Sequence, residues 1–126
     1  MWLYVCILLQ LLFMSPQQLN IQKTPRKLYI FSNEQHSVLM QQQLKLFYKD
    51  STELKERDTR IIIVKKESIL WKEFNVAPDA FTVILIGKDF TEKYRTSQLL
   101  QPATLYNLID AMPMRRQEIQ NKKRVL

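Results

Sequence analysis

Apolar residues along the chain form short continuous runs, and segments with helical spacing separate them. Arg26–Phe31, Arg60–Val64 and Phe81–Ile86 are rich in β-branched and aromatic residues, which predicts strands. The last two of these runs are apolar without alternation. This pattern is typical of strands buried on both faces, as in the central or parallel strands of a covered sheet. Thr91–Arg95 alternates instead, which predicts a more exposed strand in a hairpin with Phe81–Ile86.

The segment after the first run has helical spacing. Ser32–Gln35 matches a capping box in which Ser32 accepts from the amide of Gln35. The helix is expected to run to about residue 48. Met40, Leu44 and Phe47 then share one face of it.

Further helices are expected at residues 69–75 and from Pro102, since proline suits a first helical position. Pro113 should end that last helix, because the residue before a proline avoids helical geometry. Residues 117–126 are polar and basic and are expected to be frayed.

The predicted element order is β-α-β-α-β-β-α. A helix between the first strands implies a crossover with these strands parallel, and the terminal hairpin adds an antiparallel pair. We therefore predict an α/β, thioredoxin-like (peroxiredoxin-like) fold, with a four-stranded mixed sheet and helices on both faces. Other small α/β sandwiches with the same element order remain the alternative.

The first 20 residues carry no charged side chain, and Trp2–Met14 is apolar except for Gln10. This run is shorter than the roughly 18–20 residues that span a membrane. It fits the hydrophobic region of a signal peptide, and an uncleaved anchor or a misassigned start codon are the alternatives. We thus expect a signal peptide at 1–20, a linker at 21–25, one domain at 26–118 and a basic tail at 119–126. An exported chain would be periplasmic or extracellular.

Cysteine usage limits the chemistry. Cys6 is the one cysteine of the chain, and it lies in the apolar run. The remainder can form no internal disulfide, thiolate metal site or cysteine nucleophile. No cofactor is expected. The net charge of +7 supports solubility and leaves open an acidic partner.

Four sequence segments together resemble one protein family. They are Leu54–Asp58 (LKERD), Phe81–Asp89 (FTVILIGKD), Lys93–Arg95 (KYR) and Leu108–Glu118 (LIDAMPMRRQE). This is an uncharacterised thioredoxin-like family, domain of unknown function 4174. It occurs in exported bacterial proteins and in animal sushi-repeat-containing and coiled-coil-domain-containing matrix proteins. The resemblance covers residues 27–118 and departs at Phe90, where the family usually has glycine.

The resemblance implies a thioredoxin- or peroxiredoxin-like fold, an extracytoplasmic location and, in animal relatives, roles in adhesion and matrix assembly. It implies no reaction. Such a fold places redox cysteines where this chain has Ser32–His36, and a hydroxyl cannot perform thiol exchange. Pro78 lies three residues before Phe81, which leaves open whether it matches the proline of that fold.

Other candidate chemistry is sparse. His36, the one histidine, has Glu34 nearby, but no activated nucleophile is beside it, so an exposed helix position is the simpler interpretation. Gly87-Lys88-Asp89 joins two predicted strands and so predicts a hairpin turn, since a phosphate loop leads into a helix. Carboxylates are scattered without metal-ligand spacing.

A polar set remains as the candidate binding site. Arg57 with Asp110, or Asp58 with Arg115 or Arg116, could form salt bridges that lock the C-terminal segment onto the sheet. The other interpretation is a basic patch for an anionic partner. The candidate residues are Arg57, Asp58, Lys88, Lys93, Arg95, Asp110, Arg115 and Arg116.

Two further features bear on partners. Met112 and Met114 flank Pro113 and either pack under the domain or form an adaptable contact surface. Lys122-Lys123-Arg124 is a solvated tail or a polyanion contact. Nucleic acid is disfavoured because aromatic and basic residues do not interleave.

The sequence predicts an exported, non-catalytic thioredoxin-like module for envelope or matrix interactions. Its partner would be an unknown protein or a polyanion, with no membrane span after signal cleavage. The alternatives are an oxidoreductase that uses a partner's thiol, a hydrolase around Glu34 and His36, and a polyanion binder using Arg115 to Arg124.

Overall fold

The computed structural model describes residues 24–125. Within them, a four-stranded mixed sheet has the order β2-β1-β3-β4. Strand β1 is parallel to β2 and antiparallel to β3, and β3 is antiparallel to β4. This order and these directions agree with the predicted thioredoxin-like α/β fold. The strands are Arg26–Phe31 (β1), Thr59–Val64 (β2), Thr82–Ile86 (β3) and Glu92–Thr96 (β4).

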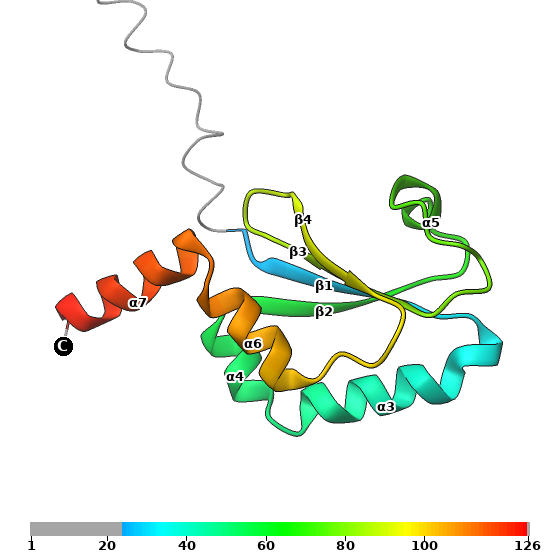
Figure 1. Cartoon of the computed structure of the whole chain (residues 1–126), viewed down its shortest axis with the longest axis horizontal. Coiled ribbons are helices and arrows are strands. Elements are labelled where there is room, and N and C mark those ends of the chain that lie inside the picture. The colour runs from blue at the N-terminus through cyan, green and yellow to red at the C-terminus, as the bar shows by residue number, and fades with distance from the viewer. Residues whose placement is uncertain (1–23, 126) are drawn as a thin grey trace, which may run out of the picture.

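Helices cover both faces of the sheet unequally. Helices α3, α4 and α6 lie on one face, the short α5 lies on the other, and α7 extends beyond one end of the sheet (Figure 1). The helical elements are the 3-10 turn Glu34–His36 (η2), Ser37–Tyr48 (α3), Ser51–Glu56 (α4), Leu70–Glu73 (α5), Pro102–Asp110 (α6) and Pro113–Val125 (α7).

The larger part of the core lies under α3 and α6. Successive side chains of a strand alternate between faces, so Leu28 and Ile30 of β1 point toward these helices. They pack with Phe47 of α3 and with Leu105 and Ile109 of α6, and all of them are fully buried. Met40 and Leu44 are partly buried against the same core, which confirms the predicted face of Met40, Leu44 and Phe47.

The opposite face is aromatic. Tyr29 and Phe31 of β1 pack beneath α5 against Trp71 and Phe74. The rings of Phe31 and Trp71 meet edge to face with centroids 5.1 Å apart, a favoured geometry for aromatic pairs. The short helix α5 and the residue that follows it, Phe74, cover this face with large side chains.

The burial predicted for the second strand was wrong. Strand β2 is parallel to β1, as expected, but it is an edge strand, and Ile63 is 46% exposed. A continuous apolar run does not distinguish an edge strand from a central one. Strand β3, with the same pattern, is buried at every position.

The start of the first helix also differs from the prediction. The side chain of Asn33, not that of Ser32, accepts from the amide of His36 and caps η2, while the hydroxyl of Ser32 donates to the carbonyl of Asn33. A separate helix, α4, follows at Ser51–Glu56, beyond the predicted end of the first helix.

Residues 117–125 are helical rather than frayed. Pro113 ends α6, as expected, but it also opens α7, which continues to Val125. A proline at a first helical position loses no hydrogen bond. The predicted signal peptide lies outside the described residues, as does most of the linker. Among residues 24–125, every helix is too short or too polar to span a lipid bilayer.

Candidate functional site

Charged side chains gather beside the starts of β1 and β2, where α4, the β3–β4 turn and α7 meet. We call this set the ion-pair cluster. Its members come from β1, the α4 segment, the β3–β4 turn, the end of α6 and α7, so only the tertiary fold brings these segments together. The members are Arg26, Glu53, Glu56, Arg57, Asp58, Lys88, Asp110, Arg115, Glu118 and Lys122.

Arg57 joins α4 to the end of α6. Its Nε and Nη2 donate to the two oxygens of Asp110 at 3.0 and 2.9 Å, which is the bidentate geometry that favours arginine. Its Nη1 also donates to Glu53, and its guanidinium lies 4.4 Å from the ring centroid of Tyr106. The predicted pairing of Arg57 with Asp110 is therefore confirmed.

Glu118 fixes the first turns of α7 against the sheet. Its carboxylate accepts from Arg26 and pairs with Lys88, both at 3.0 Å, and accepts from Arg115 at 3.4 Å. Burial would raise the pKa of Glu118, but the hydrogen bonds from Arg26 and Lys88 outweigh it and lower the pKa. Glu118 therefore acts as a fixed anion.

Arg115 is buried and ties α7 to α6 and α4. It donates to Asp110 at 3.1 Å and to the carbonyl of Glu56 at 3.1 Å. Burial would raise the pKa of Asp110, but hydrogen bonds from Arg57 and Arg115 lower it. Asp58 pairs with Lys88 at 2.9 Å. The predicted pairings of Asp58 with Arg115 or Arg116 do not form.

The structure thus unites Arg57, Asp58, Lys88, Asp110 and Arg115 of the predicted site. The other predicted residues lie outside the cluster.

Lys93 of β4 pairs with Asp89, and Arg95 pairs with Glu92 and donates to the carbonyl of Phe74. Arg116 is exposed on α7.

Sequence reasoning missed two central members of the cluster. Arg26 is 1% exposed, and the carboxylate of Glu118 forms ion pairs with three cationic side chains. In the sequence, Arg26 is only the first residue of a predicted strand. No local pattern links it to a glutamate 92 positions away. Buried Gln43 was also missed, although its helical spacing from Met40 and Phe47 places it on the inner face.

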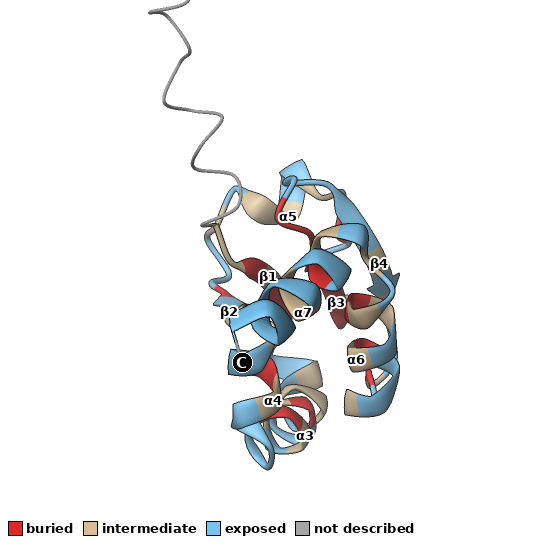
Figure 2. Cartoon of the chain, turned by 90° about the vertical axis from the view of Figure 1, so that its left-hand side faces the viewer, coloured by how far each residue is buried: buried red, intermediate tan, exposed pale blue. Residues whose placement is uncertain are grey.

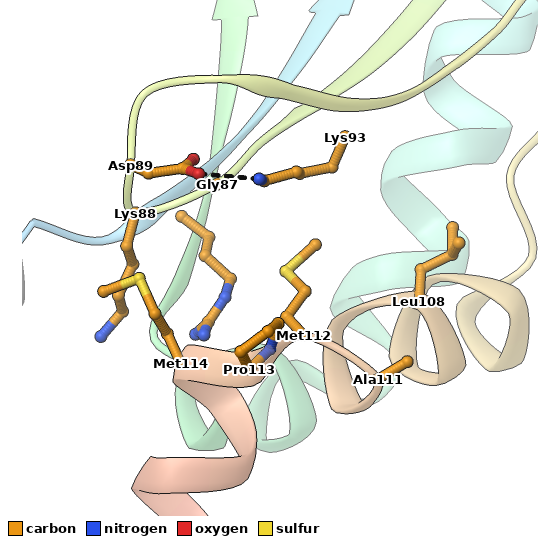
Figure 3. A pocket seen from close by; sticks show the side chains of 10 residues that line it. Gly87, Lys88, Asp89, Lys93, Leu108, Ala111, Met112, Pro113 and Met114 are labelled. Atoms are coloured by element: carbon orange, nitrogen blue, oxygen red, sulfur yellow. Dashed lines mark hydrogen bonds and ion pairs between the residues drawn. The ribbon is translucent and has the colours of Figure 1, made fainter.

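An open groove lies next to the cluster, between the β3–β4 turn and the α6–α7 corner (Figure 3). Its volume is about 520 Å³. Leu108, Ala111, Met112, Pro113 and Met114 supply an apolar wall.

The opposite wall of the groove is polar and charged. Gly87, Lys88, Asp89 and Lys93 line it, and Arg26 lies at the start of β1. Lys93 donates to Asp89 at 2.8 Å. This hydrogen bond, together with that from Thr91, lowers the pKa of Asp89 to about 2.

Gly87 permits the close approach of these side chains. A Cβ at this position would lie 2.6 Å from Cε of Lys93 and 2.9 Å from a carboxylate oxygen of Asp89. The turn is a hairpin turn, as predicted, with the amide of Gly87 bonded to the carbonyl of Thr91. Phe90 has a φ of 64°, a conformation that favours glycine, so the departure from the family pattern falls at a strained position.

The end of β1 where the thioredoxin-like fold places its redox cysteines carries no thiol. His36 Nε2 is 2.8 Å from the carbonyl of Asp79, and Nδ2 of the Asn33 side chain donates to the carbonyl of Pro78 at 3.4 Å. The Pro78 loop therefore does lie against this position. Within residues 24–125, no group of three His, Cys, Asp or Glu residues could hold a metal ion.

These features define an α/β domain whose four-stranded mixed sheet is consistent with a thioredoxin-like fold, with a groove at the end of the sheet opposite Ser32–His36. Residues 19–118 match the model of the family described as domain of unknown function (DUF4174). The chain belongs to that family. No curated protein and no solved structure matches the chain.

Proposed function

We propose that this domain is an exported, non-catalytic binding module that acts in envelope or extracellular-matrix interactions through the groove. The observation that carries the proposal is the groove itself. It is an open hollow of about 520 Å³ whose walls are apolar on one side and charged on the other, with three cationic side chains and one carboxylate. Such a mixed surface suits an apolar side chain of a protein partner that has a carboxylate nearby.

The two methionines support this role. Met112 and Met114 are half-buried, and both line the groove instead of filling the core completely. Methionine adapts its shape to an incoming side chain, which suits a binding surface. Met114 also borders a second hollow of about 450 Å³ beside Gln117 and Asn121, so it forms a ridge that a partner can contact from both sides.

The ion-pair cluster supports the module by holding the groove in shape. Lys88 and Arg26 line the groove and are bound to Glu118, and Glu118 belongs to the helix that begins in the groove wall. The position of α7 therefore depends on the same ion pairs as the position of the turn. A preformed site of this kind loses little conformational entropy on binding.

The export part of the proposal rests on the apolar run Trp2–Met14. The non-catalytic part rests on the absence of cysteine after Cys6 and on the ordinary capping contacts of Asn33 and His36. An oxidoreductase would need a thiol from its partner. A hydrolase would need a nucleophile near Glu34 and His36.

The polyanion alternative has fewer residues available than the sequence suggests. Arg115 is buried in the ion-pair cluster, and Lys122 is bound to Glu56. Arg116, Lys123 and Arg124 remain exposed on α7. Figure 2 shows this helix mostly exposed, so it can reach a partner without any rearrangement.

The test is affinity capture from the envelope or extracellular fraction of the source cells. Met114→Glu places a charge in the apolar wall, and a partner held by the groove should be lost. Ile69→Glu is the matched control, since Ile69 is 66% exposed beside α5 at the other end of the domain. That variant should retain the partner.

A third variant replaces Arg116, Lys123 and Arg124 with glutamine. Loss of the partner in this variant alone would move the site to α7. A specific partner retained by every variant would exclude the groove. Failure of the unaltered protein to capture any partner would contradict the binding module.

A further inference from the structure

The two edges of the sheet have different chemistry. The β4 edge carries Glu92, Lys93 and Arg95, and charges of this kind discourage pairing with another strand. The β2 edge carries Ile61, Ile62 and Ile63 in succession, with no charge among them. An apolar, β-branched edge of this kind is a template for a further strand.

The outer side of β2 is open within residues 24–125. In that part of the chain, β2 pairs with β1 alone, and no backbone hydrogen bond from outside the sheet reaches residues 60–64. A hollow of about 550 Å³ runs beside it, lined by Tyr48, Leu54 and Ile61 among others. Tyr48 is 56% exposed and Ile63 is 46% exposed.

We propose that β2 pairs with β2 of a second copy of this chain. The two strands run antiparallel, with the two-fold axis at Ile62, and the sheet continues through both copies. An interface of this type uses the same surface on each copy, so the strand must be complementary to itself.

The isoleucines meet this requirement. In the register centred on Ile62, Ile61 of one copy lies opposite Ile63 of the other, and the two copies of Ile62 face each other. Directly opposite residues point to the same face of the sheet. The exposed Ile63 of one copy is therefore covered by Ile61 of the other, which lies next to Tyr48. Pairs of β-branched residues are favourable in this position.

The charges at the ends of the strand favour the same register. Arg60 then lies opposite Val64, and Lys66 comes beside Asp58, whose side chain is 46% exposed. A register centred on Ile63 would place Arg60 opposite Lys66, and like charges in that position are unfavourable. The strand is thus complementary to an antiparallel copy of itself in charge as well as in shape.

The first test measures the oligomeric state of the full chain by sedimentation velocity over a wide range of concentration. We expect a reversible dimer. Ile63→Lys places a charge in the paired edge and should weaken self-association at least about tenfold, because the ammonium group loses water. Phe90→Lys is the control at another exposed apolar residue, on the β3–β4 turn, and should leave the dimer intact. A monomer at every concentration would overturn the proposal, as would a dimer that Ile63→Lys does not weaken.

The second test fixes the register. Directly opposite residues of antiparallel strands have Cα atoms about 4.5–5.5 Å apart, within the range of a disulfide. Ile62→Cys in a Cys6→Ser chain should therefore form a disulfide-linked dimer under mild oxidation, whereas Phe90→Cys in the same chain should not. Equal cross-linking of the two variants would contradict a two-fold axis at Ile62.

Discussion

Arg57 and Asp110 share two parallel hydrogen bonds, with nitrogen–oxygen distances of 3.0 and 2.9 Å, across 53 positions of sequence. They connect the segment after α4 to the last turn of α6. Arg57 is 11% exposed, so its charge has few other partners available. Through Arg115, the same carboxylate is linked to α7.

Replacing Arg57 with alanine should lower the free energy of unfolding by about 2 kcal/mol, because Asp110 loses its bidentate partner while remaining half-buried. Arg57→Lys should recover only part of this loss, since an ammonium cannot form both bonds. Urea unfolding monitored by circular dichroism measures the change. Arg116→Ala is the control, because Arg116 is exposed on α7 outside the ion-pair cluster and its loss should change stability by less than about 0.5 kcal/mol. Equal effects of the two alanine variants would contradict this role for Arg57.

Acid should destabilise the domain through Glu118 and Asp110. The pKa of each carboxyl is lowered in the folded protein, from ordinary values of 4.5 and 3.8. A lowered pKa gives stability that is complete above the unfolded value and is lost as the pH falls through the folded value. The free energy of unfolding should therefore be level near neutral pH and should decrease below about pH 5.

Glu118→Gln should flatten that decrease and loosen α7, since the neutral amide cannot pair with both Arg26 and Lys88. Relative to the unaltered protein, amide hydrogen exchange should become faster in residues 113–125, and this increase should be larger than any in β1 and β3. Gln120→Ala, at an exposed position of α7, is the control, and it should leave the pH dependence and the hydrogen exchange unchanged. An unaltered pH profile in Glu118→Gln would exclude Glu118 as the titrating group.

Gln43 should contribute to stability through a buried pair of hydrogen bonds. Its Nε2 donates to the carbonyl of Leu100 at 2.8 Å, and the amide of Leu100 donates to its Oε1 at 2.7 Å. Gln43→Ala leaves both backbone groups unpaired, which should cost about 2–3 kcal/mol. Thermal and urea unfolding measure the loss. Gln42→Ala, at the exposed neighbouring position, should cost less than about 0.5 kcal/mol, and a similar loss in both variants would argue against the hydrogen bonds as the cause.

Phe90→Gly should stabilise the protein by about 1 kcal/mol. The φ of 64° at Phe90 is unfavourable for a residue with a Cβ and is readily adopted by glycine. The side chain is 58% exposed, so its removal loses little packing. Phe90→Ala is the decisive comparison, because it removes the ring but keeps the strain. If alanine stabilised the protein as much as glycine, the backbone conformation would not be the reason.

The order of the strands and the helices α3, α5 and α6 could be predicted from the sequence, because they follow from patterns that repeat within a few residues, whereas α4 and α7 were not predicted. Phe47 and Leu44 have helical spacing, and Phe81–Ile86 is an apolar run bounded by a turn. The pairing of Arg57 with Asp110 could be named as one of several choices. It could not be ranked above a pairing of Asp58 with Arg115, since each charge has partners of the opposite sign at many positions.

The sequence by itself determined the fold class, the family resemblance and the absence of any thiol after Cys6, because these depend on residue identity and local periodicity. The tertiary structure decided which strand lies at the edge, which cations meet Glu118, and where Met112 and Met114 face the groove. Arg26 and Glu118 are 92 positions apart in the sequence, and no local sequence pattern predicts a contact between residues so far apart. Their contact exists because sheet pairing and helix packing bring the ends of distant segments to the same place.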